Sequence, residues 1–119
     1  MNTATYQAIF QLTSNDEAVY KSMIGQIKNL QNALNNAVSI EVVCHGRSSS
    51  FCISGQNPFQ EAIEQLMATG VQIKVCANML QANNLSAQQL ITGIQTVPAG
   101  IAELVIRQQQ GWSYIKAGF

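Results

Sequence analysis

The sequence predicts a single α/β domain in which a mainly parallel sheet carries helices on both faces. Strand-like apolar segments alternate along the chain with segments of helical periodicity. Parallel neighbours in a sheet are joined by crossovers, and the crossovers cover the sheet, so this alternation favours a parallel arrangement. The chain has 119 residues, the usual size of one domain, and contains no internal repeat or low-complexity segment. We therefore expect one domain over residues 1–119.

The first third of the chain predicts a strand followed by a long helix. The strand covers residues 6–12, and Ser14 and Glu17 after it have the spacing of a capping box, which predicts a helix start. Apolar side chains then recur at steps of three or four and stack on one helical face. They are Val19, Met23, Ile27, Leu30 and Leu34. We expect this helix to end near residues 35–36.

The middle of the chain predicts a buried strand, a long loop and a second helix. A β-branched run over residues 40–45 indicates the strand, and the polar segment 47–57 indicates the loop. Asn57 and Pro58 then predict a helix start, because asparagine caps helices well and proline suits their first position. Gly70 is placed to end this helix.

The last third predicts short elements in the order strand, helix, strand, helix and strand. They cover residues 71–77, 86–91, 94–97, 98–111 and 112–116. The segment 78–84 is too short for a full helix. In the helix that Pro98 opens, Ile101, Leu104 and Val105 lie on one side, which predicts that side as the apolar face.

The surface is predicted to be poor in charge. Only 10% of the residues are charged, against about 25% in typical soluble proteins. Such a surface favours a subunit that hides part of itself against its own copies, so we expect a homo-oligomer. The absence of any basic run argues against nucleic acid as a partner. With neither a signal segment nor the ~18 apolar residues of a membrane span, we expect a cytoplasmic protein without a membrane partner.

Cys76 is the leading candidate for chemistry. Three cysteines without a secretory signal indicate reduced thiols rather than a disulfide framework. Cys76 ends the third predicted strand and precedes a turn, where backbone N–H groups and the positive end of a helical turn favour a thiolate. The alternative is a packed thiol, since free cysteine is often buried. The residues leave both interpretations open.

His45 is the second candidate, because it ends the second predicted strand just before Gly46. An imidazole there can act as an acid, a base or an anion contact, and a hydrogen-bonded structural histidine is the alternative. Ligands of parallel sheets collect outside the carboxyl ends of the strands, so we expect His45 and Cys76 to share a site. Cys44 points to the opposite strand face from His45 and is expected in the core, so we predict no metal site.

The polar loop after His45 is a candidate for anion binding. Ser48 and Ser49 are hydroxyl donors in this loop, but it matches neither nucleotide-binding glycine pattern, so no cofactor is predicted. Cys52 in the same loop is either a thiol that pairs with Cys76 or an incidental residue. The sparse carboxylates, Glu103 among them, are interpreted as solvated helix faces.

Four segments occur in a particular order over residues 38–117. They are V-V-C-H-G, G-V-Q-I-K-V-C-A-N-M-L, V-P-A-G-I-A-E-L-V and Q-Q-G-W-S-Y-I-K. In this order they resemble the DsrE/DsrF-like family. The resemblance implies a three-layer α/β/α sandwich of the DsrEFH type, with a mainly parallel five-stranded sheet and assembly as trimers or hexamers. It also aligns Cys76 with the family's strand-end cysteine, His45 and Gly46 with a His-Gly pair, and Asn78 with the residue two positions after the cysteine.

The resemblance implies two functional classes, which the sequence leaves open. Some relatives relay sulfur through a persulfide on a cysteine at this strand end. Cys76 would then be a sulfurtransferase-like carrier, with His45 stabilising the anion and other sulfur-transfer proteins as partners. In the second class the domain is a noncatalytic oligomeric module that binds a small anion or metabolite, and Cys76 is merely packed. The chain has Met79 where related sequences tend to have threonine, and it lacks the arginine-rich stretch of the sulfur-carrying subunits.

Overall fold

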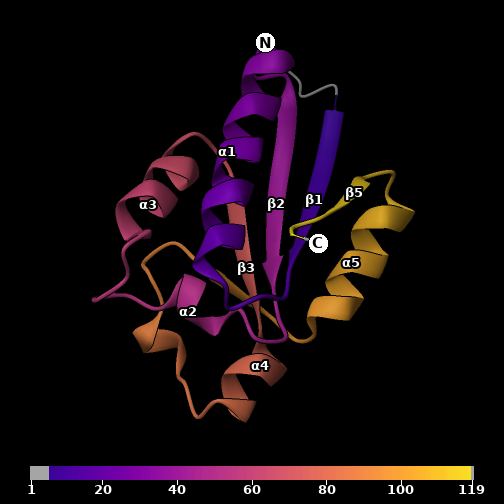
Figure 1. Ribbon diagram of the computed structural model, residues 1–119. Coiled ribbons are helices and arrows are strands. Elements are labelled where there is room, and N and C mark those ends of the chain that lie inside the picture. Colours follow the sequence, from indigo (N-terminus) through magenta and orange to yellow (C-terminus); the bar gives the residue numbers. More distant parts are fainter. Residues whose placement is uncertain (1–5, 119) are drawn as a thin grey trace.

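The computed structural model describes residues 6–118, so residues 1–5 and 119 of the expected domain lie outside the described part. Its elements in chain order are β1 (Tyr6–Leu12), α1 (Glu17–Ala33), β2 (Val38–Cys44), α2 (Ser49–Cys52), α3 (Gln60–Ala68), β3 (Gln72–Cys76), α4 (Ala77–Ala82), the 3-10 helix η1 (Ala87–Gln89), β4 (Gln95–Val97), α5 (Gly100–Gln109) and β5 (Ser113–Lys116). The predicted alternation of strands and helices is confirmed (Figure 1).

The five strands form one sheet in the order β4-β3-β2-β1-β5, and every neighbouring pair is parallel. The predicted α/β fold with a five-stranded sheet is confirmed. β4 and β5 lie at opposite edges, so α5 crosses the whole sheet to join them and contacts β1, β2, β3 and β5. In Figure 1, α1 and α3 lie together on one side of the sheet and α5 lies on the other.

The face of the sheet under α1 and α3 carries a large apolar core. The carboxylate of Asp16 caps α1 by accepting a hydrogen bond from the N–H of Ala18 (2.9 Å). The buried residues of α1 are Val19, Tyr20, Met23, Ile24 and Ile27. They pack in one cluster with residues of the three central strands and of α2 and α3. Full burial of each large side chain contributes about 1.5–3 kcal/mol, so this cluster is the main source of stability.

The opposite face, under α5, has a much smaller apolar core. Ile9, Val43 and Leu104 form it, and Trp112 packs against them. The predicted apolar side of α5 is wrong at two of its three residues, because Ile101 and Val105 are 58% and 54% exposed. The face of α5 that packs on the sheet instead contains both apolar and charged residues. Its more buried residues are Gly100, Glu103, Leu104 and Arg107, at the three- and four-residue steps of one helical face.

Two segments predicted as loop or turn contain helices. The loop predicted over 47–57 contains α2, and the segment 78–84 lies largely in α4. Both helices are short, at four and six residues, but each buries a large apolar side chain, Phe51 in α2 and Leu80 in α4. Tertiary packing therefore stabilises helices that are too short to form alone.

The helix starts in the second half differ slightly from the prediction. α3 begins two residues after Pro58, because the side-chain oxygen of Asn57 first accepts a hydrogen bond from the N–H of Phe59 (2.9 Å) and closes a turn. The helix predicted over 86–91 is the shorter η1, capped by Ser86. No helix in the described part of the chain has both the length and the apolar character needed to cross a membrane.

Candidate functional site

Cys76 lies at the junction between β3 and α4. It is the last residue of β3 and the N-cap of α4, which sits at the carboxyl end of the sheet (Figure 1). The backbone N–H groups of the first helical turn have no partner within the helix, and the helix dipole adds positive potential there. Cys76 is 6% exposed. Cys76 is therefore a largely enclosed residue at the start of a short helix.

His45 and Cys76 each follow the last pair of β2 and β3. That pairing ends with Cys44 opposite Val75, and His45 and Cys76 are the next residues on the two strands. The N–H of His45 donates to the carbonyl oxygen of Leu12 (3.1 Å), which continues the ladder beyond β2. Alternation along β2 directs His45 toward the face that α5 covers, where Gly100 contacts its ring. Cys76, at the end of β3, packs with the core cluster of the opposite face.

The ring of His45 is fixed by two residues that the sequence analysis missed. The side-chain nitrogen of Gln11, on β1, lies 2.8 Å from Nε2 of His45. The hydroxyl of Tyr114, on β5, donates to the side-chain oxygen of Gln11. Because an amide nitrogen can only donate, Nε2 accepts and the proton of the ring lies on Nδ1. Burial lowers the pKa of His45 below its usual value, which favours this neutral form. The sequence feature that could have pointed to Gln11 was its polar side chain near the end of the apolar strand β1.

The beginning of α5 covers the ring of His45. A Cβ atom at Gly100 would lie 3.0 Å from Cβ and 3.1 Å from Cγ of His45, so the helix approaches this closely only because residue 100 is glycine. The first N–H groups of α5 have no partner within the helix, since the first helical bond runs from Glu103 back to Ala99. The start of α5 therefore lies against His45, and the start of α4 lies at Cys76.

The predicted ligand-binding residues are spread over different environments. Gly46 is exposed with a φ of 67°, and Asn78 is exposed in the first turn of α4. Ser48 is fully buried, and its hydroxyl donates to the carbonyl oxygen of His45 (2.8 Å), which supports the loop from inside. Ser49 lines a separate cavity of about 420 Å³ together with Asn57, Asn83 and four other residues. Neither His45 nor Cys76 lines that cavity.

The other two cysteines lie deeper in the large core than Cys76. Cys44 and Cys52 are fully buried, as expected for Cys44, whereas the predicted loop position of Cys52 is wrong because it lies in α2. The hydrogen bond from Cys52, and then burial, hold the pKa of the Cys44 thiol well above its usual value. Within the described chain all three cysteines are free thiols. Cys44 and Cys52 are therefore shielded thiols of low reactivity.

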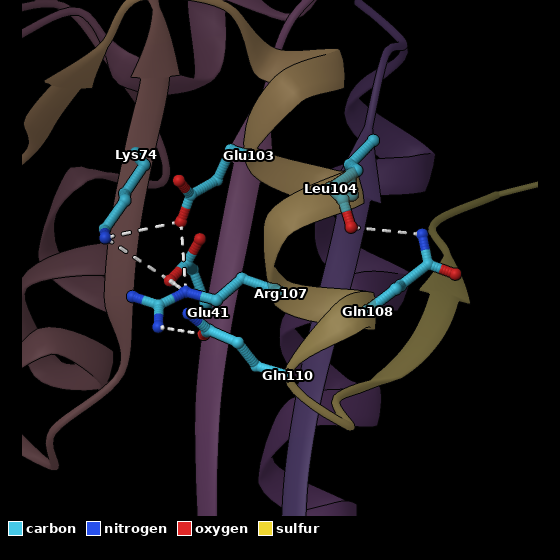
Figure 2. A network of polar contacts seen from close by, with 7 residues as sticks. All are labelled: Glu41, Lys74, Glu103, Leu104, Arg107, Gln108 and Gln110. Atoms are coloured by element: carbon cyan, nitrogen blue, oxygen red, sulfur yellow. Dashed lines mark hydrogen bonds and ion pairs between the residues drawn. The ribbon is translucent and has the colours of Figure 1, made fainter.

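A group of four charged side chains beneath α5 was also missed (Figure 2). Glu41 of β2 is fully buried, and it pairs with Lys74 of β3 and Arg107 of α5. Glu103 joins the same two cations, so its interpretation as part of a solvated helix face is wrong. The apolar pattern of residues 40–45 concealed Glu41. The presence of one carboxylate, Glu41, in this apolar run could have predicted a buried ion pair, since charged residues are rarely buried without partners.

Comparisons with known proteins agree with this architecture. The profile of the DsrE/DsrF-like family matches residues 7–117. A solved structure of a protein of unknown function, MTH1491 from Methanobacterium thermoautotrophicum, is 28% identical with a TM-score of 0.89, covering 93% of this chain and 98% of that one. No curated protein matches the chain.

Two further solved structures are more distant in sequence. The ychN protein from E. coli is 17% identical with a TM-score of 0.79, over 94% of this chain and 99% of that one. The protein of unknown function BT1422 from Bacteroides thetaiotaomicron is 17% identical with a TM-score of 0.77, over 98% of both chains. At this identity the similarity shows the fold alone, and the predicted sandwich is confirmed by it.

Proposed function

This chain belongs to the DsrE/DsrF-like family, and we propose that it carries sulfane sulfur as a persulfide on Cys76. The position of Cys76 carries this proposal: it is the N-cap of α4, it follows the last pair of β2 and β3 as His45 does, and it pairs with Val97 of β4, three residues before α5. A persulfide is a stronger acid than a thiol and is held as an anion. The N–H groups of two helix starts supply the donors that such an anion needs.

The transfer step is a thiol–disulfide type of exchange. The Cys76 thiolate attacks the outer sulfur of a donor persulfide, and the S–S bond of the donor breaks as the new S–S bond forms on Cys76. The donor leaves as a thiolate, which takes up the proton that Cys76 released. A thiolate of an acceptor protein then removes the outer sulfur by the same step. No net oxidation occurs, because the oxidation state of the moving sulfur is unchanged.

His45 has a donor role in this proposal. Gln11 occupies Nε2, so His45 offers the N–H at Nδ1 rather than a free base at Nε2. A neutral imidazole that donates a hydrogen bond stabilises a sulfur anion without forming an ion pair that would hold it too tightly. Gly46 and Asn78, exposed on either side of the strand ends, are proposed contacts for the incoming donor or acceptor.

A second candidate function rests on the burial of Cys76. With 6% of its surface exposed, the cysteine is nearly as enclosed as a packed core thiol. The same helix starts would then form a noncatalytic site for a small anion or metabolite, with no covalent step. Both candidates use one location, so the chemistry of the Cys76 sulfur decides between them.

We also propose that the protein acts in the cytoplasm as a homotrimer or hexamer. Support comes from the low fraction of charged residues and from three exposed apolar side chains on the outer side of α5. These are Ile101, Val105 and Ile106. Exposed apolar groups of this kind mark interaction surfaces when they are contiguous.

Sulfur loading tests the proposed function. The purified protein is incubated with polysulfide, and intact mass and peptide mass spectrometry locate any added sulfur atom. We expect one added sulfur on Cys76, no added sulfur in Cys76→Ser, and normal loading in Cys52→Ser, the matched control. Retained loading in Cys76→Ser, or no loading of the wild-type protein, would exclude Cys76 as a carrier and favour the binding module.

A further inference from the structure

Two carboxylates beneath α5 compete for the same two donors (Figure 2). Nζ of Lys74 lies 3.4 Å from Oε1 of Glu41 and 3.4 Å from Oε2 of Glu103. Nε of Arg107 lies 3.1 Å from that same oxygen of Glu41 and 3.2 Å from that same oxygen of Glu103. The Nε group carries a single hydrogen, and another guanidinium nitrogen of Arg107 donates to Gln110 (3.0 Å). The single hydrogen on Nε of Arg107 is therefore shared by the two carboxylates, and each carboxylate uses one and the same oxygen for both cations.

The second carboxylate oxygen of Glu41, Oε2, has no hydrogen-bond donor among the described residues. This oxygen is buried, and the side chain is 0% exposed. A buried ionised oxygen without a donor is costly. The carboxyl group of Glu103 is a close neighbour of Glu41, because one oxygen of each lies within 3.4 Å of both Nζ of Lys74 and Nε of Arg107. A proton on the carboxyl group of Glu41 removes this cost, because the neutral group needs no further donor and can itself donate to Glu103.

The acidities of the two groups agree with this assignment. Burial, and after it the neighbouring carboxyl of Glu103, raises the pKa of Glu41 to about 7. The hydrogen bond from Glu41 holds the pKa of Glu103 below its usual value. These two directions are those expected of a carboxylic acid that donates to a carboxylate.

We propose that Glu41 and Glu103 share a proton and that this proton latches α5 onto the sheet, so that its loss to solvent loosens the cover of the site at Cys76 and His45. The coupling follows from the helix itself. Glu103 lies in the first turn of α5, three residues after Gly100, which rests on the ring of His45. A helix that lifts at Glu103 also lifts at Gly100. The latch regulates the site described above and rests on the proposed function in that respect.

The pH dependence follows from all groups that face the latch. Glu41 has a pKa of about 7 with α5 seated and returns toward 4.5 when α5 lifts. Between these pH values the protein binds one more proton when α5 is packed on the sheet than when α5 has moved away. The free energy that favours the packed position therefore falls as pH rises from 4.5 to 7, and it is constant above pH 7. The pKa of Glu103 is lowered, so Glu103 stays ionised throughout this pH range and its titration does not contribute to the change. Lys74 and Arg107 supply the positive charges, and the partner of Glu41 on β1 is the apolar Ile9.

His45 also titrates near α5, and its effect on the packing of α5 changes with pH in the opposite direction to that of Glu41. The two effects have to be measured separately. Burial against α5 lowers the pKa of His45, so the seated helix disfavours protonated His45, and this contribution to seating grows as pH rises toward 6.5. Glu41→Gln isolates the Glu41 contribution, because glutamine cannot titrate but still donates to Glu103. The His45 contribution is the same in both proteins and cancels in their ratio.

Amide hydrogen exchange of α5 tests the latch. Protection factors of the α5 amides are measured between about pH 5 and pH 8 in the wild-type protein, in Glu41→Gln and in Glu61→Gln, an exposed control on α3. The ratio of wild-type to Glu41→Gln protection should fall about tenfold per pH unit up to pH 7 and then stay constant. Glu61→Gln should follow the wild-type protein throughout. Alkylation of Cys76, expressed relative to Glu41→Gln, should speed up over the same window.

Two results separate this inference from the proposed function. A wild-type to Glu41→Gln ratio that is flat from pH 5 to pH 7, or a Glu41 carboxyl carbon that titrates in NMR near 4.5, would overturn the latch even if Cys76 takes up sulfur. A Cys76 that takes up no sulfur would overturn the proposed function and leave the exchange result standing.

Discussion

The two faces of the sheet are built differently. Under α1 and α3, apolar side chains from three strands and four helices pack into one continuous cluster, and the neighbouring thiols of Cys44 and Cys52 are fully buried within it. Under α5, three buried apolar residues share the space with four charged ones and with the ring of His45. Close-packed apolar side chains have few other arrangements, whereas the strength of ion pairs changes with protonation. The face under α1 and α3 therefore supplies most of the stability. The face under α5 is less stable and can open locally, as regions around binding sites often do.

All three cysteines pack in the large cluster, but at different depths. Cys44 and Cys52 are fully buried, and the hydrogen bond from Cys52, and then burial, raises the pKa of the Cys44 thiol well above its usual value. Cys76 lies at the edge of the sheet, where a strand ends and a helix begins. Position in the fold, rather than local sequence, thus separates one candidate for chemistry from two structural residues.

The largest expected effect is a loss of stability in the core under α1. Ile27→Ala should lower the free energy of unfolding by about 3–4 kcal/mol, because the close-packed neighbours of Ile27 cannot close the cavity. Leu104→Ala should cost less, about 2 kcal/mol, because Leu104 belongs to a cluster of three under a single helix. Urea denaturation followed by circular dichroism measures both. An equal or larger loss at Leu104 would mean that the two faces stabilise the fold alike.

A smaller effect is expected at the two glycines that face these regions. Gly100→Ala should cost about 1–2 kcal/mol and shift the NMR resonances of His45, since the added methyl group meets the ring and α5 has to move. Gly25→Ala in α1 is the matched control. It meets no atom within 4 Å and should raise stability by about 0.5–1 kcal/mol through helix propensity. Unchanged His45 resonances in Gly100→Ala would show that α5 does not cover the ring closely.

The smallest effect on stability is expected on the outer side of α5. Replacing Ile101 and Val105 by serine should change the free energy of unfolding of the separated subunit by no more than about 0.5 kcal/mol for each exposed position. The same change should convert the proposed trimer or hexamer into smaller species in light scattering. Ala102→Ser, on the same helix and also exposed, should leave the mass unchanged. A wild-type protein that is monomeric at micromolar concentration would contradict the proposed assembly.

Most of the fold could be predicted from the sequence, because its long elements have clear periodicity. The strand over 6–12 and the apolar face of α1 follow from patterns that local physics enforces. The short helices α2 and α4 could not, because single side chains packed into the core stabilise them and no local pattern announces such packing. Expectations for α5 failed for a related reason. Its sheet-facing stripe contains Glu103 and Arg107, whose partners lie on other elements.

The candidate site could be predicted only in part. Cys76 and His45 were identifiable because Cys76 ends β3 and His45 directly follows β2, and parallel strands bring such ends to the same end of the sheet. Gln11 and Tyr114 were not identifiable, since their roles depend on the pairing of β1 with β2 and β5. The pairing order of strands distant in sequence is a tertiary property. Ser48 was expected to face a ligand, but it supports the loop from inside.

Thiol reactivity in the native protein tests the central claim most directly. A limiting amount of a small alkylating reagent is added at neutral pH, and peptide mass mapping follows the labelling of each cysteine with time. We expect Cys76 to be labelled at least about tenfold faster than Cys44 and Cys52, because the latter are fully enclosed and must wait for unfolding. After denaturation all three should react at similar rates. Native labelling of Cys76 that is as slow as that of Cys44 would contradict the account.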